Sequence, residues 1–245
     1  MRPTWVPRVL KVTGISAGYG NLQILDGVTM DATPGKITVV VGPNGSGKST
    51  LLKSISGIAS VFEGTIQVDD RVITHMSPTE VARSGVAYLP QTENVFTNLT
   101  VRENLRLAGY TVHERDYPQR FKVALEIFPQ LSKYLSTKSA NLSGGERQMV
   151  AMSMALMRKP TVVLFDEPTA NLAPKVATQV LNTISSITKD MNLTTVLVEQ
   201  NAKRALEIGS NAFLLVSGKT VFSGTCRELL DHKELGKLYL GLQVA

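Results

Sequence analysis

A glycine-rich loop between an apolar run and a helical stretch constrains the fold of this chain more than any other feature. The loop spans residues 42–49 and reads GPNGSGKS, which matches the P-loop pattern in full. Residues 37–41 before it are all β-branched, and residues 48–58 after it carry apolar side chains at helical spacing. The loop therefore joins a buried strand to a helix, as in an α/β fold.

The chemistry of such a loop is the binding of phosphate. Its glycines let the backbone approach phosphate oxygens, so that amide N–H groups and the positive end of the next helix face the anion. Lys48 adds a positive charge for the β and γ phosphates, and the Ser49 hydroxyl is the expected Mg²⁺ ligand. The residues expected to bind the nucleotide here are Gly42, Pro43, Asn44, Gly45, Ser46, Gly47, Lys48, Ser49 and Thr50.

Further apolar runs of strand length follow the loop and are separated by helical stretches, which favours a mostly parallel sheet buried on both faces. These runs are residues 86–89, 162–165, 195–198 and 212–216. Residues 9–31 and 63–73 instead alternate apolar and polar side chains, as antiparallel hairpins do.

The stretch from about residue 100 to residue 157 lacks strand patterning and is predicted to be a helical insertion. The expected fold class is α/β, a P-loop NTPase (RecA-like) core with a small antiparallel β subdomain and an inserted helical subdomain. We expect one domain at residues 8–245. Its parts are a core at 8–90 and 160–225, a helical part at 91–159 and a C-terminal tail at 226–245.

Two acidic residues end one of the predicted strands. Asp166 and Glu167 follow the run 162–165, at the end of the strand where parallel sheets deliver residues to a ligand crevice. Beside a P-loop, Asp166 can hold Mg²⁺ through water, and Glu167 can polarise the water that attacks the γ-phosphate. A helix cap or a surface position is the alternative for an isolated Asp-Glu pair.

Composition narrows the class of protein. The longest apolar runs are far shorter than the roughly 20 residues that span a bilayer, and the first residues show no signal-peptide pattern, so we expect a cytoplasmic chain. The net charge of +6 comes from scattered basic residues, which does not favour nucleic acid as a partner. Cys226 is the only cysteine and the three histidines form no metal-binding pair, so we expect no zinc or iron–sulfur site.

A second motif, LSGGERQ at Leu142–Gln148, is not explained by the P-loop. Through it the chain resembles the ABC ATPase family, over about residues 9–241. In that family two cassettes dimerise head to tail, and the resemblance implies that Ser143, Gly144 and Gly145 close over ATP held by the partner's P-loop. Ser143, three residues before a glutamate, also fits a helix cap, and both interpretations can hold at once.

The resemblance extends to three further positions. Tyr19 matches the aromatic residue that stacks on adenine, and Gln91 matches the glutamine that links Mg²⁺ to the helical part. Gln200 stands at the γ-phosphate position, where most relatives have a histidine. A neutral amide donates a hydrogen bond but cannot become a cation, so a role for imidazolium is not expected.

Two departures from the general pattern point to one branch of the family. Gln200 is one of them, and Ala173, where many relatives carry an aspartate, is the other. Together with Tyr239–Gly241 near the C-terminus, they make the chain similar to the second ATPase of branched-chain amino acid importers. Relatives of that branch also serve urea and amides, which stay open as alternative cargoes.

The resemblance implies an importer subunit that binds and hydrolyses ATP with Mg²⁺ at the cytoplasmic face of the cell membrane. The implied partners are two transmembrane permease subunits, a sister ABC ATPase that completes the dimer, and an extracytoplasmic substrate-binding protein. The residues expected in catalysis are Lys48, Glu167 and Gln200, and those expected at Mg²⁺ are Ser49, Gln91 and Asp166.

Two other classes are disfavoured. A soluble ABC ATPase acting on nucleic acid or ribosomes usually carries paired cassettes or long coiled coils, whereas this chain has one cassette and no sustained heptads. A P-loop kinase would leave the motif at Ser143 unexplained.

Overall fold

The computed structural model describes residues 6–92 and 94–234, and its central feature is a six-stranded sheet. The strand order is β10-β9-β3-β8-β7-β6, and all neighbours are parallel except β10 with β9. The strands are β3 (Ile37–Val41), β6 (Val86–Leu89), β7 (Val162–Asp166), β8 (Thr194–Val198), β9 (Asn211–Val216) and β10 (Lys219–Thr225). Every residue of β3, β7 and β8 is buried, which confirms the prediction of a mostly parallel, doubly covered sheet.

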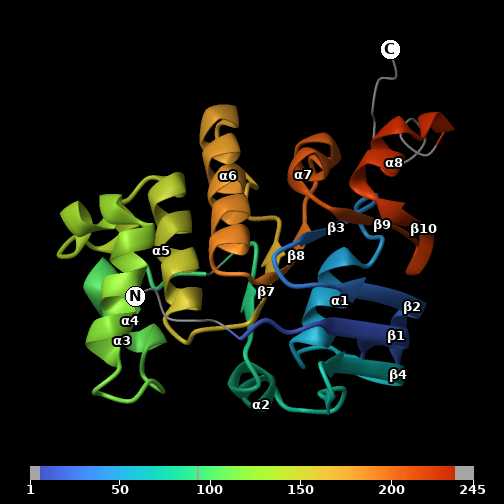
Figure 1. Cartoon of the computed structure of the whole chain (residues 1–245), viewed down its shortest axis with the longest axis horizontal. Helices are drawn as coiled ribbons and strands as arrows, with labels where there is room; N and C mark the ends of the chain where they lie inside the picture. The colour runs from blue at the N-terminus through green and yellow to red at the C-terminus, as the bar shows by residue number, and fades with distance from the viewer. Residues whose placement is uncertain (1–5, 93, 235–245) are drawn as a thin grey trace.

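A second sheet is antiparallel, has the strand order β2-β1-β4-β5, and lies near α1 (Figure 1). Its strands are β1 (Leu10–Tyr19), β2 (Leu22–Ala32), β4 (Ser60–Val68) and β5 (Arg71–Val72). A tight turn joins β1 to β2, where Tyr19 pairs with Leu22 and Gly20 has a φ of 55°. The hairpins that the alternating segments predicted are therefore present.

The described residues also form eight α-helices. They are α1 (Lys48–Ile55), α2 (Pro78–Arg83), α3 (Val101–Ala108), α4 (Tyr117–Ile127), α5 (Gly144–Leu156), α6 (Pro174–Asp190), α7 (Ala202–Ile208) and α8 (Cys226–Asp231). Helix α1 ends three residues before the predicted residue 58, because Gly57 turns the chain with a φ of 74°. A Cβ at Gly57 would lie 2.6 Å from the Met76 carbonyl oxygen, so only glycine fits this turn.

The described residues between β6 and β7 form helices joined by loops, as predicted, and the only β-pairing among them is one isolated bridge between Thr100 and Lys138. Two short 3-10 helices, η1 (Pro129–Tyr134) and η2 (Ser139–Asn141), lie between α4 and α5. Both α3 and α5 begin with a capping box, which satisfies backbone N–H groups at their N-termini.

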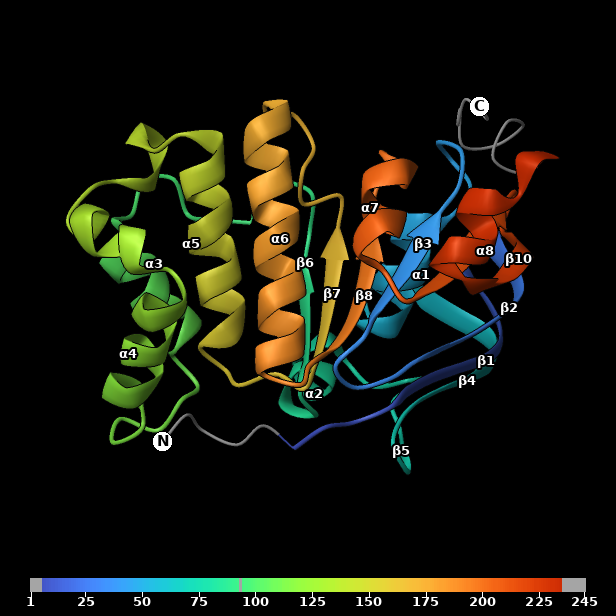
Figure 2. The same cartoon turned by 45° about the horizontal axis from the view of Figure 1, so that its top comes forward.

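The six-stranded sheet separates two hydrophobic cores. Val39 and Val163 belong to the core that includes α3 to α8, whereas Val40 and Leu164 belong to the core that includes α1, α2 and the four-stranded sheet. Neighbouring residues of one strand thus serve opposite faces, as the period of two in a strand requires. Figure 2 shows α5, α6 and α7 as a row over one face.

The predicted C-terminal tail begins with α8, whose Cys226 and Leu229 are buried in the core. Residues 235–245, which include Tyr239–Gly241, lie outside the described residues. Within residues 6–92 and 94–234, no helix has the length and apolar character needed to cross a membrane.

Candidate nucleotide-binding site

The P-loop forms a cradle between β3 and α1. Gly42 has a φ of 152°, and a Cβ there would lie 2.0 Å from the Leu215 carbonyl oxygen. Gly47, just before α1, has a φ of 101°, and its Cβ would lie 2.7 Å from the Leu25 side chain. The Cβ of a residue at Gly45 would meet no heavy atom within 4 Å. Gly42 and Gly47 are thus required by close contacts, whereas Gly45 is required by its φ of 77° and faces open space that a ligand can enter.

Lys48 is buried and folded back onto this loop. Its Nζ donates hydrogen bonds to the carbonyl oxygens of Gly42 and Pro43, both at 2.9 Å. Burial lowers the pKa of Lys48, and the charges of Glu167 and Asp166 act in the opposite direction. Because the ammonium group has three donors, it can turn from these carbonyl oxygens to the oxygens of a phosphate.

Ser46 adds a hydrogen-bond donor to the loop. Its Oγ is buried and has no hydrogen-bond partner among residues 6–92 and 94–234. A buried hydroxyl without a partner is unfavourable, and a phosphate oxygen in the cradle would accept its hydrogen. The N-terminus of α1 adds the positive end of its dipole. The residues of the loop therefore fit the phosphates of a nucleotide.

Asp166 ends β7, and its carboxylate accepts hydrogen bonds from two hydroxyl groups. Ser49 Oγ donates to Oδ1 and the Tyr88 hydroxyl donates to Oδ2, each at 2.9 Å. A hydroxyl and a carboxylate oxygen in direct contact are the hard-oxygen donors that Mg²⁺ prefers. Two of the residues predicted at the metal are therefore neighbours.

Glu167 follows in a tight turn with a positive φ of 47°, and its backbone N–H donates to the Val198 carbonyl oxygen at 2.9 Å. Gln91 Nε2 donates to Glu167 Oε2, also at 2.9 Å. Burial raises the pKa of Glu167, while the charge of Lys48 lowers it. A raised pKa makes a carboxylate a better proton acceptor.

A cavity of about 500 Å³ collects most of the predicted site residues. The P-loop provides one part of its wall, and Gln91, Glu167 and Gln200 provide another. Its lining residues are Tyr19, Ile24, Asn44, Gly45, Gly47, Lys48, Ser49, Thr50, Gln91, Glu167 and Gln200. The residue expected to stack on adenine and the residue expected at the γ-phosphate thus share one cavity.

The motif at Ser143 lies elsewhere, at the N-terminus of α5. This helix belongs to the hydrophobic core on the other face of the six-stranded sheet from α1, and its first residues do not line the cavity. Ser143 is the N-cap, and its N–H donates to Glu146 Oε2 at 2.7 Å, so the helix-cap interpretation is confirmed. A Cβ at Gly144 or Gly145 would lie 2.8 or 2.5 Å from side chains near the start of α6.

Comparison with known proteins identifies the family. Residues 25–170 match the family described as ABC transporter. The chain is also 50% identical over 234 residues to a probable branched-chain amino acid transport ATP-binding protein, LivF, of Archaeoglobus fulgidus. That match covers 96% of this chain and 99% of the relative. The chain belongs to the ABC transporter family.

Two further comparisons support the family and its fold. The high-affinity branched-chain amino acid transport ATP-binding protein BraG of Pseudomonas aeruginosa is 34% identical, over 95% of this cassette and 100% of that protein. A crystal structure of the ADP conformation of an ABC transporter cassette superposes with a TM-score of 0.84 at 27% identity, covering 93% and 97% of the two chains. As an ABC cassette, the chain is an ATP-binding ATPase and part of a transporter complex with permease components.

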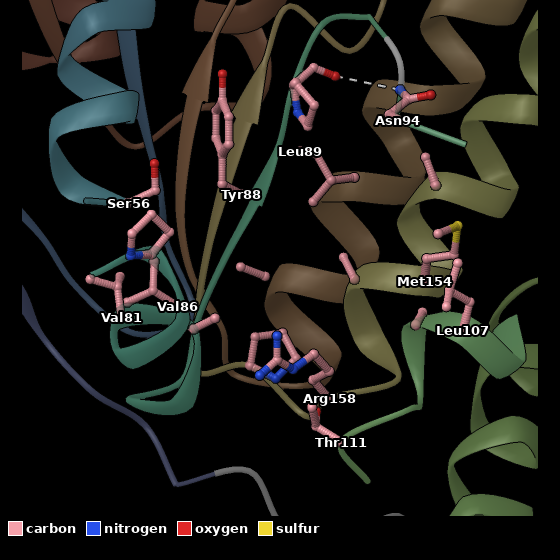
Figure 3. A pocket seen from close by; sticks show the side chains of 18 of the residues that line it. Ser56, Val81, Val86, Tyr88, Leu89, Asn94, Leu107, Thr111, Met154 and Arg158 are labelled. Carbon is pink, nitrogen blue, oxygen red and sulfur yellow. Dashed lines mark hydrogen bonds between the residues drawn. The ribbon is translucent and has the colours of Figure 1, made fainter. Parts of the chain in front are cut away.

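The cassette also contains an apolar groove of about 570 Å³, between the core that carries β6 and the helical part that carries α3 and α5 (Figure 3). Val81 and Val86 lie on one side, and Leu107 and Met154 lie on the other (Figure 3). Arg158 is the charged residue in this otherwise largely apolar lining. The groove is separate from the nucleotide cavity, because the lining residues of the two differ.

Two contacts of the cassette site were not predicted. Tyr88 donates to Asp166, and the buried Glu199 accepts hydrogen bonds from Thr169. The available signals were a phenol within the apolar run 86–89 and an acid directly after the buried strand β8. Neither signal identifies the residue that is contacted, because the two partners are 78 and 30 positions apart in the sequence.

Proposed function

We propose that this cassette energises the import of branched-chain amino acids from the cytoplasmic face of the cell membrane. The observation that carries the proposal is the 50% identity to the Archaeoglobus fulgidus LivF over nearly the full length of both chains. The second relative named for the same cargo, at 34% identity over 95% of this chain, supports it. Urea and amides are less well supported, because both of these relatives are named for branched-chain amino acids.

In the proposed mechanism, Lys48 turns from the Gly42 and Pro43 carbonyl oxygens to the β and γ phosphates of ATP. Ser46, Thr50 and the backbone N–H groups of the loop complete the phosphate site, and Tyr19 stacks on adenine. Ser49, Asp166 and Gln91 would hold Mg²⁺. When bound, Mg²⁺ neutralises negative charge on the phosphate oxygens.

Glu167 polarises the water that attacks the γ-phosphate. The support is its place in the cavity, its raised pKa and the hydrogen bond from Gln91 that orients its carboxylate. Gln200 lines the same cavity and donates a hydrogen bond to the γ-phosphate through its side-chain amide.

The working unit is a head-to-tail dimer with a sister ATPase. Ser143, Gly144 and Gly145 stand at the start of α5, outside the cavity of their own chain. In a dimer they complete the partner's site, where the Ser143 hydroxyl, the glycine N–H groups and the helix dipole face the γ-phosphate.

Each of the two permeases inserts a helix into the apolar groove of one ATPase subunit. The closing and opening of the ATPase dimer moves this helix and so acts on the permease. Leu89 and Pro90 line the groove, and the next residue, Gln91, donates a hydrogen bond to Glu167 in the site. This segment therefore connects the groove to the site. Its rim includes Phe96, Leu107 and Tyr110, which are 54%, 44% and 84% exposed. An extracytoplasmic binding protein delivers the cargo to these permeases.

Affinity purification of the Glu167→Gln cassette tests this proposal. The variant keeps an oxygen that accepts from Gln91 but lacks the carboxylate, so we expect ATP binding with turnover reduced by about a hundredfold or more. Purified with Mg-ATP from solubilised native membranes, it should carry two polytopic proteins and a second ATPase, identified by mass spectrometry.

Lys48→Ala is the control, since it should lose nucleotide binding and the ATP-dependent partners. Leucine, isoleucine and valine uptake in cells expressing the variant should fall, and unchanged uptake would argue against this cargo. Ribosomal or nucleic-acid partners alone would contradict the importer.

A further inference from the structure

A buried acid joins the two loops that carry the proposed catalytic side chains. Glu199 follows β8, is 3% exposed, and directly precedes Gln200. Its Oε1 accepts hydrogen bonds from the Thr169 backbone N–H at 3.0 Å and from Thr169 Oγ1 at 2.8 Å. Thr169 lies two residues after Glu167, so one carboxylate connects the surroundings of both residues.

This contact continues the pairing of β7 with β8 beyond the end of the sheet. Asp166 pairs with Val198 in parallel register, and the Glu167 N–H donates to the Val198 carbonyl oxygen at 2.9 Å. The strands end there, and the bonds between Glu199 and Thr169 tie the loops that follow. Because Glu167 has a positive φ of 47°, its turn needs such contacts to keep its shape.

Gln200 is held between two fixed neighbours. On one side is Glu199 with its bonds to Thr169. On the other is Asn201, the N-cap of α7, whose Oδ1 accepts from the Arg204 N–H at 3.3 Å. Gln200 itself is exposed and lines the nucleotide cavity. Its side chain is therefore presented to the cavity from a backbone that is anchored before and after it.

Burial of the Glu199 carboxylate disfavours its charged form. Burial raises the pKa of Glu199, and the hydrogen bonds from Thr169 lower it. The nearby charge of Glu167 raises it further, and the backbone of Gln200 lowers it. Burying an acid is unfavourable unless strong hydrogen bonds compensate, and those to a charged acceptor are about twice as strong as neutral ones.

We propose that Glu199 is a positioning residue, whose carboxylate clamps the loop after β7 to the loop after β8 and thereby fixes Gln200 relative to Glu167 during hydrolysis. The inference rests on the proposed roles of these two residues. The P-loop is on different elements, so the clamp should affect turnover and leave nucleotide affinity unchanged.

The test compares ATP hydrolysis and nucleotide affinity in Glu199→Ala, Glu199→Gln and Thr169→Val, each assembled in the complete transporter complex. We expect Glu199→Ala to lower kcat about tenfold or more with less than a twofold change in KM for ATP. Glu199→Gln keeps a neutral acceptor and should retain more turnover. Thr169→Val, which removes one donor and preserves shape, should lie between wild type and Glu199→Ala.

A double-mutant cycle separates positioning from structural damage. If Glu199 acts through Gln200, adding Glu199→Ala to Gln200→Ala should cause little further loss of kcat. Losses that multiply would overturn the proposal, as would a rise in KM at unchanged kcat. Thr195→Val is the matched control, since it removes a buried hydroxyl contact with Thr188 at the other end of β8.

If Glu199→Ala folds poorly, Thr169→Val still tests the clamp, because it removes the Thr169 Oγ1 bond to Glu199 and leaves the backbone N–H bond in place. Wild-type kcat for Thr169→Val together with Glu199→Gln would overturn the clamp. Failure of the proposed function is separately visible, since cargo uptake measures the importer while the ratios of kcat between variants measure the clamp.

Discussion

At the scale of single residues, two hydroxyl groups hold the Asp166 carboxylate, and only one of them belongs to the P-loop. Tyr88 donates to Oδ2 from β6, the strand next to β7. Burial, together with the charge of Asp166, raises the pKa of Tyr88 far above its ordinary value, so the phenol stays protonated and remains a donor. We infer that Tyr88 fixes the orientation of Asp166, one of the residues proposed to hold Mg²⁺.

Tyr88→Phe should weaken the effect of Mg²⁺ on nucleotide binding by about tenfold, the usual loss when a group that orients a metal ligand is removed. Affinity for a fluorescent ATP analogue, measured across a range of Mg²⁺ concentrations, checks this. Affinity without Mg²⁺ should stay unchanged. Tyr117→Phe in α4 is the control, and equal effects of both variants would contradict the role of Tyr88.

The sequence could indicate the role of a residue where a local motif indicates its chemistry. The P-loop, Asp166 and Glu167 are examples, because their neighbours in the chain give them meaning. Contacts between segments could not be predicted: Gln91 bonds to Glu167 across 76 positions, and Thr169 bonds to Glu199 across 30. Such partners depend on the strand order, which a local pattern does not contain.

At the scale of elements, the N-terminus of α5 has a pH-dependent contact. The Tyr134 hydroxyl, followed by the capping bonds of Ser143, holds the pKa of Glu146 below its ordinary value of 4.5. Because the pKa is lower in the folded state, the stabilisation is complete above the unfolded-state pKa. It is lost as the pH falls through the folded-state pKa.

Glu146→Gln should therefore be less stable than wild type at pH 7, and the difference should shrink as the pH falls from about 5 to below 4. Urea unfolding of the nucleotide-free cassette at several pH values measures both free energies of unfolding. A difference that stays constant over this range would contradict the contribution of the carboxylate charge.

The apolar strands and the hairpins could be predicted because their patterns are strong. The edge strand β10 was not predicted, since it alternates exposed and half-buried residues and lies beyond the last apolar run. Helices α2 and α8 are six residues each, too short for a periodic pattern, although capping boxes begin both. Tertiary packing decides these elements.

At the scale of the whole molecule, the apolar groove is separate from the nucleotide site. Substitutions in the groove should therefore prevent assembly with the permeases and leave nucleotide binding intact. Tyr110→Asp or Leu107→Asp should abolish copurification with the permeases and cargo uptake, because the proposed permease helix would bury the new charge. Nucleotide affinity of the isolated cassette should stay at the wild-type value.

Val221→Asp in β10 is the matched control, because Val221 is 47% exposed and Leu107 is 44% exposed. Loss of assembly in all three variants would indicate general instability. Normal assembly of both groove variants would place the permease contact elsewhere on the cassette.

Because Ser143 lies outside the P-loop cavity of its own chain, mutations at Lys48 and at Ser143 should affect different sites of the dimer. In the proposed dimer each chain provides two unlike halves, so a pair with a sister ATPase would have two composite sites that differ. A lesion at Lys48 and a lesion at Ser143 of this chain then disable opposite sites. One chain carrying both lesions would silence both sites, whereas the Ser143 lesion placed in the sister instead would leave one site intact.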